Sequence, residues 1–159
     1  MTKMGFAEGG CACSAVRYRM TAPPIFVHCC HCTWCQRESG SAFAVNALIE
    51  ASEVALLKGQ AVRVSVPTAS GRGQTFTRCP SCSVGLWSNY SGAGERINFI
   101  RVGTLDDPSL APPDIHIYTS SMQPWVTLPN EAVAKTGYYK RDAHWPADSI
   151  RRYDAARAA

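Results

Sequence analysis

The chain lacks any long apolar run, and this absence limits its relation to membranes. No stretch approaches the ~20 apolar residues of a membrane-spanning helix. The first residues also contain no apolar segment of the kind that a secretory signal peptide carries. We therefore expect a cytoplasmic protein without a membrane partner.

Charge is also scarce in this chain. Charged residues make up 18% of the 159 residues and hydrophobic residues 46%, which is typical of a folded chain long enough for one domain with a core. Six basic and three acidic residues from Lys135 onward give +3 of the net charge of +4. The remaining +1 gives no footprint for nucleic acid, so we do not expect nucleic acid as a partner. The basic tail fits a solvated helix face.

Cysteine, in contrast, is abundant. Seven of the eight cysteines form a C-x-C, a C-H-C-x-x-C and a C-x-x-C, which are Cys11 and Cys13; Cys30, Cys32 and Cys35; and Cys79 and Cys82. Cys29 is left over, and its apolar neighbours suggest a buried thiol. A disulfide framework is the alternative, but a C-x-C disulfide closes a small, strained ring. In the reducing compartment that we expect, thiols stay free or bind metal.

The cysteine count predicts one closed metal site and one open one. The two outer pairs supply the four thiolates of a structural zinc site, whose metal contributes to folding. The central trio supplies three ligands, and zinc with three protein ligands keeps one position for substrate or water. We expect two zinc ions per chain, with a four-thiolate iron site as the alternative for the outer pairs. A fourth ligand from Cys29 or His31 would instead make the central site closed and structural.

The central trio suits a small thiol as substrate. Three thiolates on Zn²⁺ leave a net charge near −1, so this site acidifies water weakly and favours a further thiolate. Arg37 lies close to the cluster and is a candidate to bind a substrate carboxylate, or else an exposed helix or turn residue. Ser41 is a candidate to offer a backbone N–H to the substrate. His116 is either a proton carrier near neutral pH or a structural residue.

Short alternating segments between glycines and prolines predict a mainly β fold. We expect strands at 16–20, 25–29, 43–49, 62–66, 74–77, 86–90, 97–102 and 116–118. Ser52 is expected to cap a short helical turn through Leu57 that ends at Gly59. The Ala- and Arg-rich segment 147–159 predicts a short C-terminal helix. The whole predicts a single zinc-stapled, β-rich domain over 1–130, with 131–159 as an extension packed on it or trailing it.

These motifs also occur together, in a fixed order. Their sequence is Gly9-Gly-Cys-Ala-Cys13, Val16-Arg-Tyr18, Cys30-His-Cys-Thr-Trp-Cys35-Gln-Arg37, Gly40-Ser41, Phe76, Cys79-Pro-Ser-Cys82, Gly85-Leu86, Arg101-Val-Gly-Thr-Leu-Asp-Asp-Pro108, His116-Ile117 and Trp125. This order resembles the glutathione-dependent formaldehyde-activating enzyme family, which includes centromere protein V, over about residues 5–128. One departure is Ser14, which stands where the family usually has glycine; serine adopts such a turn at modest cost.

The resemblance implies a fold, two metal sites and an activity. The fold would be β-rich, like that of a small Rab exchange factor. The structural zinc would be bound by Cys11, Cys13, Cys79 and Cys82, and the second, catalytic zinc by Cys30, Cys32 and Cys35. The implied reaction adds the thiol of glutathione to formaldehyde and gives S-(hydroxymethyl)glutathione, a carbon–sulfur lyase activity in formaldehyde detoxification. The alternatives are a non-catalytic glutathione carrier and a zinc-stapled module that binds protein or nucleic acid.

Overall fold

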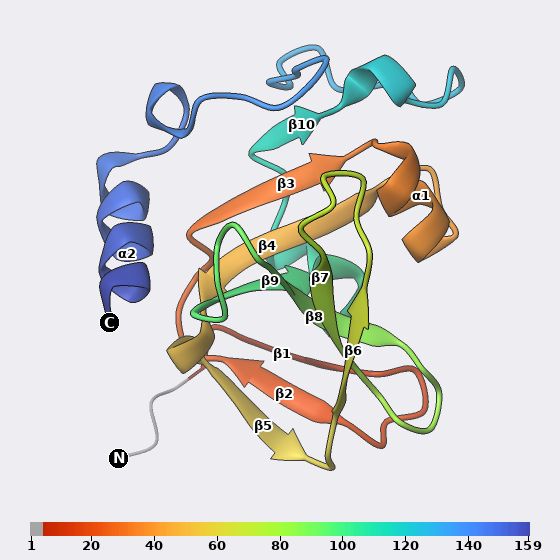
Figure 1. Cartoon of the computed structure of the whole chain (residues 1–159), viewed down its shortest axis with the longest axis vertical. Coiled ribbons are helices and arrows are strands. Elements are labelled where there is room, and N and C mark those ends of the chain that lie inside the picture. The colour runs from red at the N-terminus through yellow and green to blue at the C-terminus, as the bar shows by residue number, and fades with distance from the viewer. Residues whose placement is uncertain (1–4) are drawn as a thin grey trace.

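The computed structural model describes residues 5–159. They form two β-sheets, with a helix at the C-terminal end (Figure 1). The smaller sheet has the order β1-β2-β5, formed by β1 (Ala7–Gly10), β2 (Arg17–Met20) and β5 (Val54–Lys58). The larger sheet has the order β10-β3-β4-β9-β8-β7-β6. Its strands are β3 (Phe26–Cys30), β4 (Ala44–Glu50), β6 (Val62–Val66), β7 (Gln74–Arg78), β8 (Gly85–Tyr90), β9 (Ile97–Arg101) and β10 (Ile115–Ile117). The predicted mainly β fold is confirmed.

The alternation in β2 shows why these segments form strands. Tyr18 and Met20 are fully buried, while Arg17 and Arg19 on the opposite face pair with Glu8 of β1. Successive side chains of a strand point to opposite faces, so β2 buries one row and leaves the other in contact with solvent. The buried row packs with residues of β4, β8 and β9 in a core between the two sheets.

The helical turn predicted from Ser52 to Leu57 is wrong beyond its first residues. The structure has a 3-10 turn at Ala51–Glu53 and then β5, whose Val54 is opposite Met20 of β2. Pairing with a distant strand overrides the local preference of this segment. Gly59 ends β5 with a φ of 76°, and a Cβ there would lie 2.1 Å from the carbonyl oxygen of Ala15, so only glycine fits.

Helix α1 (Thr33–Ser39) is separated from β3 by two residues and carries Cys35 of the central cysteine cluster. Cys32 is its N-cap, and the Cys32 sulfur accepts a hydrogen bond from the backbone N–H of Cys35 at 3.3 Å. Gly40 ends the helix in the left-handed conformation. The C-x-x-C spacing therefore spans the first turn of a helix, which brings its two sulfurs to one side.

Helix α2 (Ala147–Ala158) packs on β4 and β9 of the larger sheet (Figure 1). Ser149 donates a hydrogen bond to the carbonyl oxygen of Ile25 at 2.5 Å. Arg152 forms an ion pair with Glu50 at 2.7 Å and donates to the carbonyl oxygen of Pro23 at 2.9 Å. The predicted C-terminal helix is confirmed, and its polar contacts attach it to the sheet.

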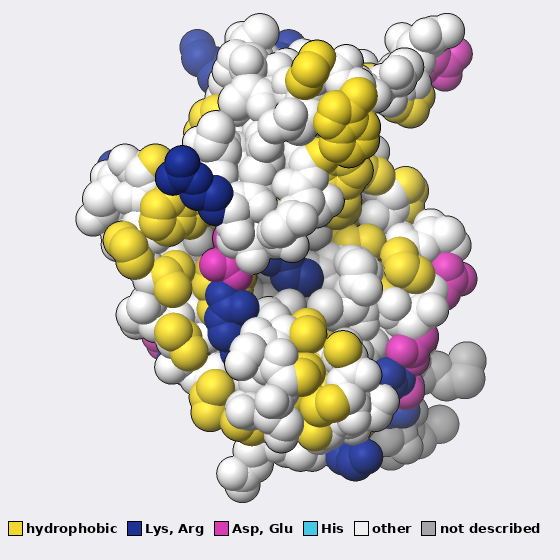
Figure 2. All heavy atoms as spheres, turned by 90° about the vertical axis from the view of Figure 1, so that its right-hand side faces the viewer, with side chains coloured by type: hydrophobic (Ala, Val, Ile, Leu, Met, Phe, Trp, Pro, Cys, Tyr) yellow, Lys and Arg dark blue, Asp and Glu magenta, His cyan; other side chains and the backbone are white. Residues whose placement is uncertain are grey.

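Within residues 5–159, no helix is both long and apolar enough to cross a membrane. On the face shown in Figure 2, basic side chains are scattered among acidic and apolar ones and do not form one continuous patch. That face offers no concentrated positive surface to a phosphate backbone.

Candidate metal centres and the adjoining cavity

The outer cysteine pairs meet as predicted. The sulfurs of Cys11, Cys13, Cys79 and Cys82 all lie within 4.8 Å of one another. Cys13 Sγ is 3.6 Å from Cys11 Sγ and 3.7 Å from Cys79 Sγ. Tetrahedral zinc with bonds of about 2.3 Å separates its sulfur ligands by about 3.8 Å. The outer cluster, as we call these four cysteines, therefore fits a closed, four-thiolate zinc site.

Each pair of the outer cluster lies on a similar tight turn. The backbone N–H of Cys11 donates to Val16 and that of Cys79 to Val84, at 3.1 and 3.0 Å. Ser14 and Ser83 follow the second cysteine of each pair and have φ angles of 60° and 63°. Non-glycine residues rarely adopt this left-handed region.

Backbone groups also stabilise negative charge on the outer cluster. The N–H of Val16 donates to Cys11 Sγ at 3.3 Å, and the N–H of Ser81 donates to Cys79 Sγ at 3.4 Å. Backbone N–H groups of Val84 and Cys13, with thiols of the cluster, lower the pKa of Cys82 to about 6. The turns thus support thiolates, which are the form that binds a metal.

The central cluster, Cys30, Cys32 and Cys35, also forms as predicted. Its three sulfurs lie within 4.8 Å of one another; Cys30 and Cys35 are buried, and Cys32 is half-buried. Hydrogen bonds from the thiols of Cys30 and Cys35 lower the pKa of Cys32 to about 2, and the same contacts raise the pKa of Cys30. A metal ion at this cluster would stabilise all three as thiolates.

Cys29 and His31 do not join the central cluster. Their ligand atoms instead group with His116, and those of all three residues lie within 4.8 Å of one another. Burial lowers the pKa of both histidines and raises the pKa of Cys29 to about 12. Among residues 5–159, the central cluster therefore consists of three cysteines, as an open site requires.

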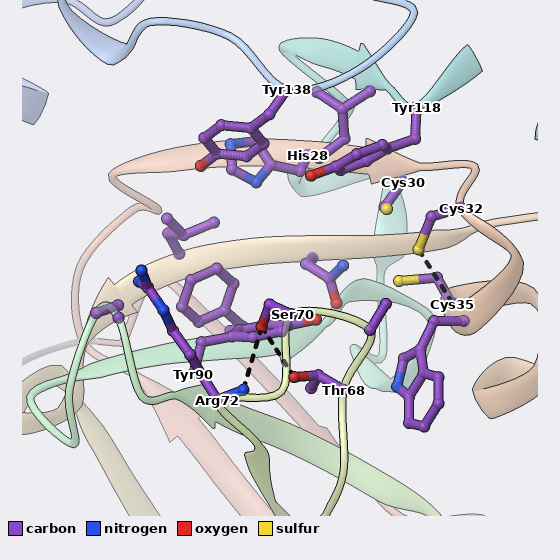
Figure 3. Close-up of a pocket in the computed structure, with 18 of the residues that line it drawn as sticks. His28, Cys30, Cys32, Cys35, Thr68, Ser70, Arg72, Tyr90, Tyr118 and Tyr138 are labelled. Carbon is purple, nitrogen blue, oxygen red and sulfur yellow. Dashed lines mark hydrogen bonds between the residues drawn. The ribbon is translucent and has the colours of Figure 1, made fainter. Parts of the chain in front are cut away.

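A cavity of about 660 Å³ opens beside the central cluster. Tyr118 and Tyr138 line one side, and the 67–73 loop and Tyr90 line the other, with the three cysteines at one end (Figure 3). Further aromatic lining comes from Trp34, Phe99, Trp145 and Tyr153. This volume suits a small molecule, and apolar walls with a few polar groups are typical of such sites.

The charged residues that line the cavity are both arginines. Arg141 is paired with Asp154 at 2.6 Å. Arg72 lies on the 67–73 loop, where its backbone N–H donates to Ser70 Oγ at 3.4 Å (Figure 3). Its guanidinium has no acidic partner among the described residues. Arg72 is thus the cation in this cavity available to an anionic group.

The two residues predicted to bind substrate lie elsewhere. Arg37 and Ser41 are exposed, and neither lines the cavity. Their role stays a prediction, whereas the sequence pattern did not point to Arg72. Its only local signal is the loop Ser70-Gly-Arg-Gly73, which nothing in the sequence connects to the central cluster.

Tyr118 has the least favourable backbone conformation of the cavity lining. It is a non-glycine residue with a φ of 56°, held by a hydrogen bond from its N–H to the carbonyl oxygen of Gly137 at 3.0 Å. Burial and the nearby cysteines raise the pKa of Tyr118, so its hydroxyl keeps its proton at neutral pH. Strained residues of this kind cluster at functional sites.

Comparison with known proteins identified a family and a few distantly similar structures. The family model described as "Glutathione-dependent formaldehyde-activating enzyme" matches residues 6–121. A crystal structure of a Rhodobacter sphaeroides protein is similar over 62% of this chain and 87% of its own, with 16% identity and a TM-score of 0.45. The comparison with curated proteins gave no significant match.

Proposed function

Because the chain belongs to the glutathione-dependent formaldehyde-activating enzyme family, we propose that it joins a small thiol, glutathione, to a small aldehyde, formaldehyde. The central observation in support is that three cysteines of one cluster, with no fourth ligand among residues 5–159, face a cavity of about 660 Å³. We further propose that each chain binds two zinc ions, one in the outer cluster and one in the central cluster.

The chain's own residues would bind and orient the substrates. A zinc ion at Cys30, Cys32 and Cys35, when bound, supplies a positive charge that stabilises the thiolate form of the entering thiol. Arg72 binds a carboxylate of that thiol from across the cavity, because a guanidinium fork matches a carboxylate. The hydroxyl of Tyr118 donates a hydrogen bond to the aldehyde oxygen.

The addition itself is a balanced proton transfer and bond formation. The thiol releases its proton to solvent, and its sulfur forms a bond with the aldehyde carbon. The electron pair of the C=O π bond moves to oxygen, which takes the proton of Tyr118, and solvent then returns a proton to the tyrosine. No oxidant or reductant is needed. Holding both reactants together accounts for most of the acceleration.

We also propose a division of labour along the chain. Residues 1–130 would carry both metal clusters, and the extension 131–159 would complete the cavity wall. Tyr138, Arg141, Trp145 and Tyr153 support this division, because they line the cavity and lie beyond the family match at 6–121.

The test is exchange NMR on formaldehyde, glutathione and their adduct at equilibrium. We expect the wild-type protein to accelerate exchange and Cys32→Ser to abolish the acceleration. Arg72→Ala should weaken glutathione binding about 10-fold, the effect of losing one carboxylate contact of roughly 1.4 kcal/mol. Arg63→Ala is the matched control, because Arg63 is exposed, pairs with Glu95 and lies outside this cavity.

Two outcomes would contradict the proposal. Exchange that stays at the uncatalysed rate at high protein concentration would reject the activity. If glutathione still binds in that case, the protein is a glutathione carrier. Unchanged exchange in Cys32→Ser would move the chemistry away from the central cluster.

A further inference from the structure

Strand β3 and the residues after it carry metal-binding side chains on two faces. Cys30 and Cys32 line the cavity, whereas the intervening His31 and the preceding Cys29 do not. Such alternation follows from extended backbone, where neighbouring side chains point to opposite sides. One short segment therefore supplies the central cluster on one face and a separate Cys–His pair on the other.

The neighbouring strand adds a third ligand on that second face. β10 runs parallel to β3 (Figure 1), and its register places His116 opposite Cys29. Cys29 Sγ lies 3.6 Å from His31 Nε2, and that nitrogen lies 3.0 Å from His116 Nδ1. His31 Nδ1 is buried and makes no hydrogen bond within the described part of the chain, so the polar contacts of this ring there are those of Nε2.

These distances are close to those that a metal ion imposes. With metal–sulfur and metal–nitrogen bonds of about 2.3 and 2.05 Å, tetrahedral zinc separates sulfur from nitrogen by about 3.6 Å and two nitrogens by about 3.3 Å. The Cys29–His31 separation already matches. The two imidazoles would have to move apart by a few tenths of an ångström.

We infer that Cys29, His31 and His116 form a third metal site, for a soft or borderline ion such as Zn²⁺ or Cu⁺. One thiolate and two imidazoles suit both ions. Zn²⁺ would leave a net charge of +1 and Cu⁺ a neutral site, which is the cheaper arrangement where the ligands are buried. Cys29 and His31 are 1% and 0% exposed, whereas His116 is half-buried and is the ligand of the three that solvent reaches. Cys29 releases its thiol proton to solvent on binding.

The backbone around His31 holds this site in place. The His31 N–H donates to the carbonyl oxygen of Ile117 at 2.9 Å. The His31 carbonyl oxygen accepts from Gln36 Nε2 at 2.7 Å and from Ser121 Oγ at 3.0 Å. Three separate segments thus hold the backbone of His31 before any ion arrives, and preorganised ligands of this kind favour binding.

The test is the metal stoichiometry of the full chain, purified under reducing conditions and loaded with Zn²⁺. Further Zn²⁺ and, separately, Cu⁺ are then titrated. We expect one ion to bind beyond the two of the outer and central clusters, and this third equivalent to be lost in Cys29→Ala and in His116→Gln. X-ray absorption should show nitrogen neighbours for the added ion in the wild type and none in the variants.

Controls separate loss of the third site from loss of the fold and from loss of the central cluster. Retention of the first two zinc ions shows that a variant is folded, and His116→Gln alters a half-buried side chain if Cys29→Ala fails to fold. Cys32→Ser loses an equivalent from the central cluster and keeps the third site, so the two losses add in Cys29→Ala/Cys32→Ser. Thiol–aldehyde exchange should be unchanged in Cys29→Ala. Equal binding of both ions by the wild type and both variants would overturn the third site and leave the proposed function untouched.

Discussion

Replacing Ser14 with glycine should stabilise this protein, although glycine usually weakens a fold. Ser14 has a φ of 60°, its side chain is exposed, and its carbonyl oxygen accepts a hydrogen bond from Lys58 Nζ at 3.0 Å, which the substitution leaves intact. A residue with a Cβ pays about 1–2 kcal/mol in this left-handed region. Glycine avoids that cost but loses roughly 0.5–1 kcal/mol of backbone entropy on folding. The net gain is about 0.5–1 kcal/mol.

The assay is thermal and urea unfolding of the zinc-loaded protein. For a chain of this length, each kcal/mol raises Tm by about 2–4 °C, so Ser14→Gly should raise Tm by about 1–4 °C. Ser83→Gly should give a similar gain, because Ser83 has a φ of 63° on the matching turn. Zinc affinity should rise by the same free energy, since binding and folding are coupled at such sites.

Ser14→Ala is the control that isolates the backbone effect. Alanine removes the hydroxyl but keeps the Cβ, so we expect no gain in Tm. If Ser14→Gly were no more stable than Ser14→Ala, the left-handed turn would not be strained, and the reasoning would fail.

Three further predictions concern the C-terminal segment and the metals. Arg152→Ala should lower the free energy of unfolding in urea by about 1–3 kcal/mol, because the side chain of its partner Glu50 is only 14% exposed. Arg151 is exposed, so Arg151→Ala should change the free energy of unfolding little. Tyr139→Phe should lower the free energy of unfolding by about 2 kcal/mol. The Tyr139 hydroxyl contacts His28 Nε2 at 2.5 Å and Trp145 Nε1 at 2.6 Å, and the substitution removes both contacts. Equal stability of Tyr138→Phe and Tyr139→Phe would contradict this prediction. Chelation of all metal should lower Tm far more than Cys32→Ser does, because that variant keeps the outer cluster. Equal losses of Tm would refute a structural role for the outer cluster.

The cysteines of the outer and central clusters were predictable from the sequence, because most of their spacing is local. Each cluster or half-cluster lies within six residues, and a tight turn or the first turn of a helix brings such near neighbours together. The pairing of Cys11 and Cys13 with Cys79 and Cys82 is non-local. It follows from the number of cysteines, since a site of four thiolates needs both pairs. The family resemblance implied the same grouping, and the structure brings the same cysteines together.

The errors in secondary structure come from long-range pairing. Val54 to Lys58 reads as a continuation of a helical turn, yet it becomes a strand because β2 offers a partner. β1 was not predicted either, since Ala-Glu-Gly-Gly has little preference for a strand on its own, and its pairing with β2 provides the hydrogen bonds.

The cavity could not be predicted, because its walls come from segments that are distant in sequence. The 67–73 loop, Tyr118 and residues between Tyr138 and Tyr153 lie together only in the folded structure. Arg37 was a reasonable candidate by its proximity in sequence to Cys35, but α1 directs it to solvent. Proximity in sequence therefore identified the cysteine clusters but not the residues that line the cavity.

The division of the site between a buried strand and surface segments has a consequence for how this protein can change. An insertion of one residue between Cys29 and Cys32 would turn the side chains after it to the opposite face and so separate residues of the same cluster, which constrains the length of this segment. The 67–73 loop and the 138–153 segment carry no ligand of the outer or central cluster. Insertions and deletions there can reshape the cavity while leaving those clusters in place, so the shape of the cavity can change independently of the two cysteine clusters.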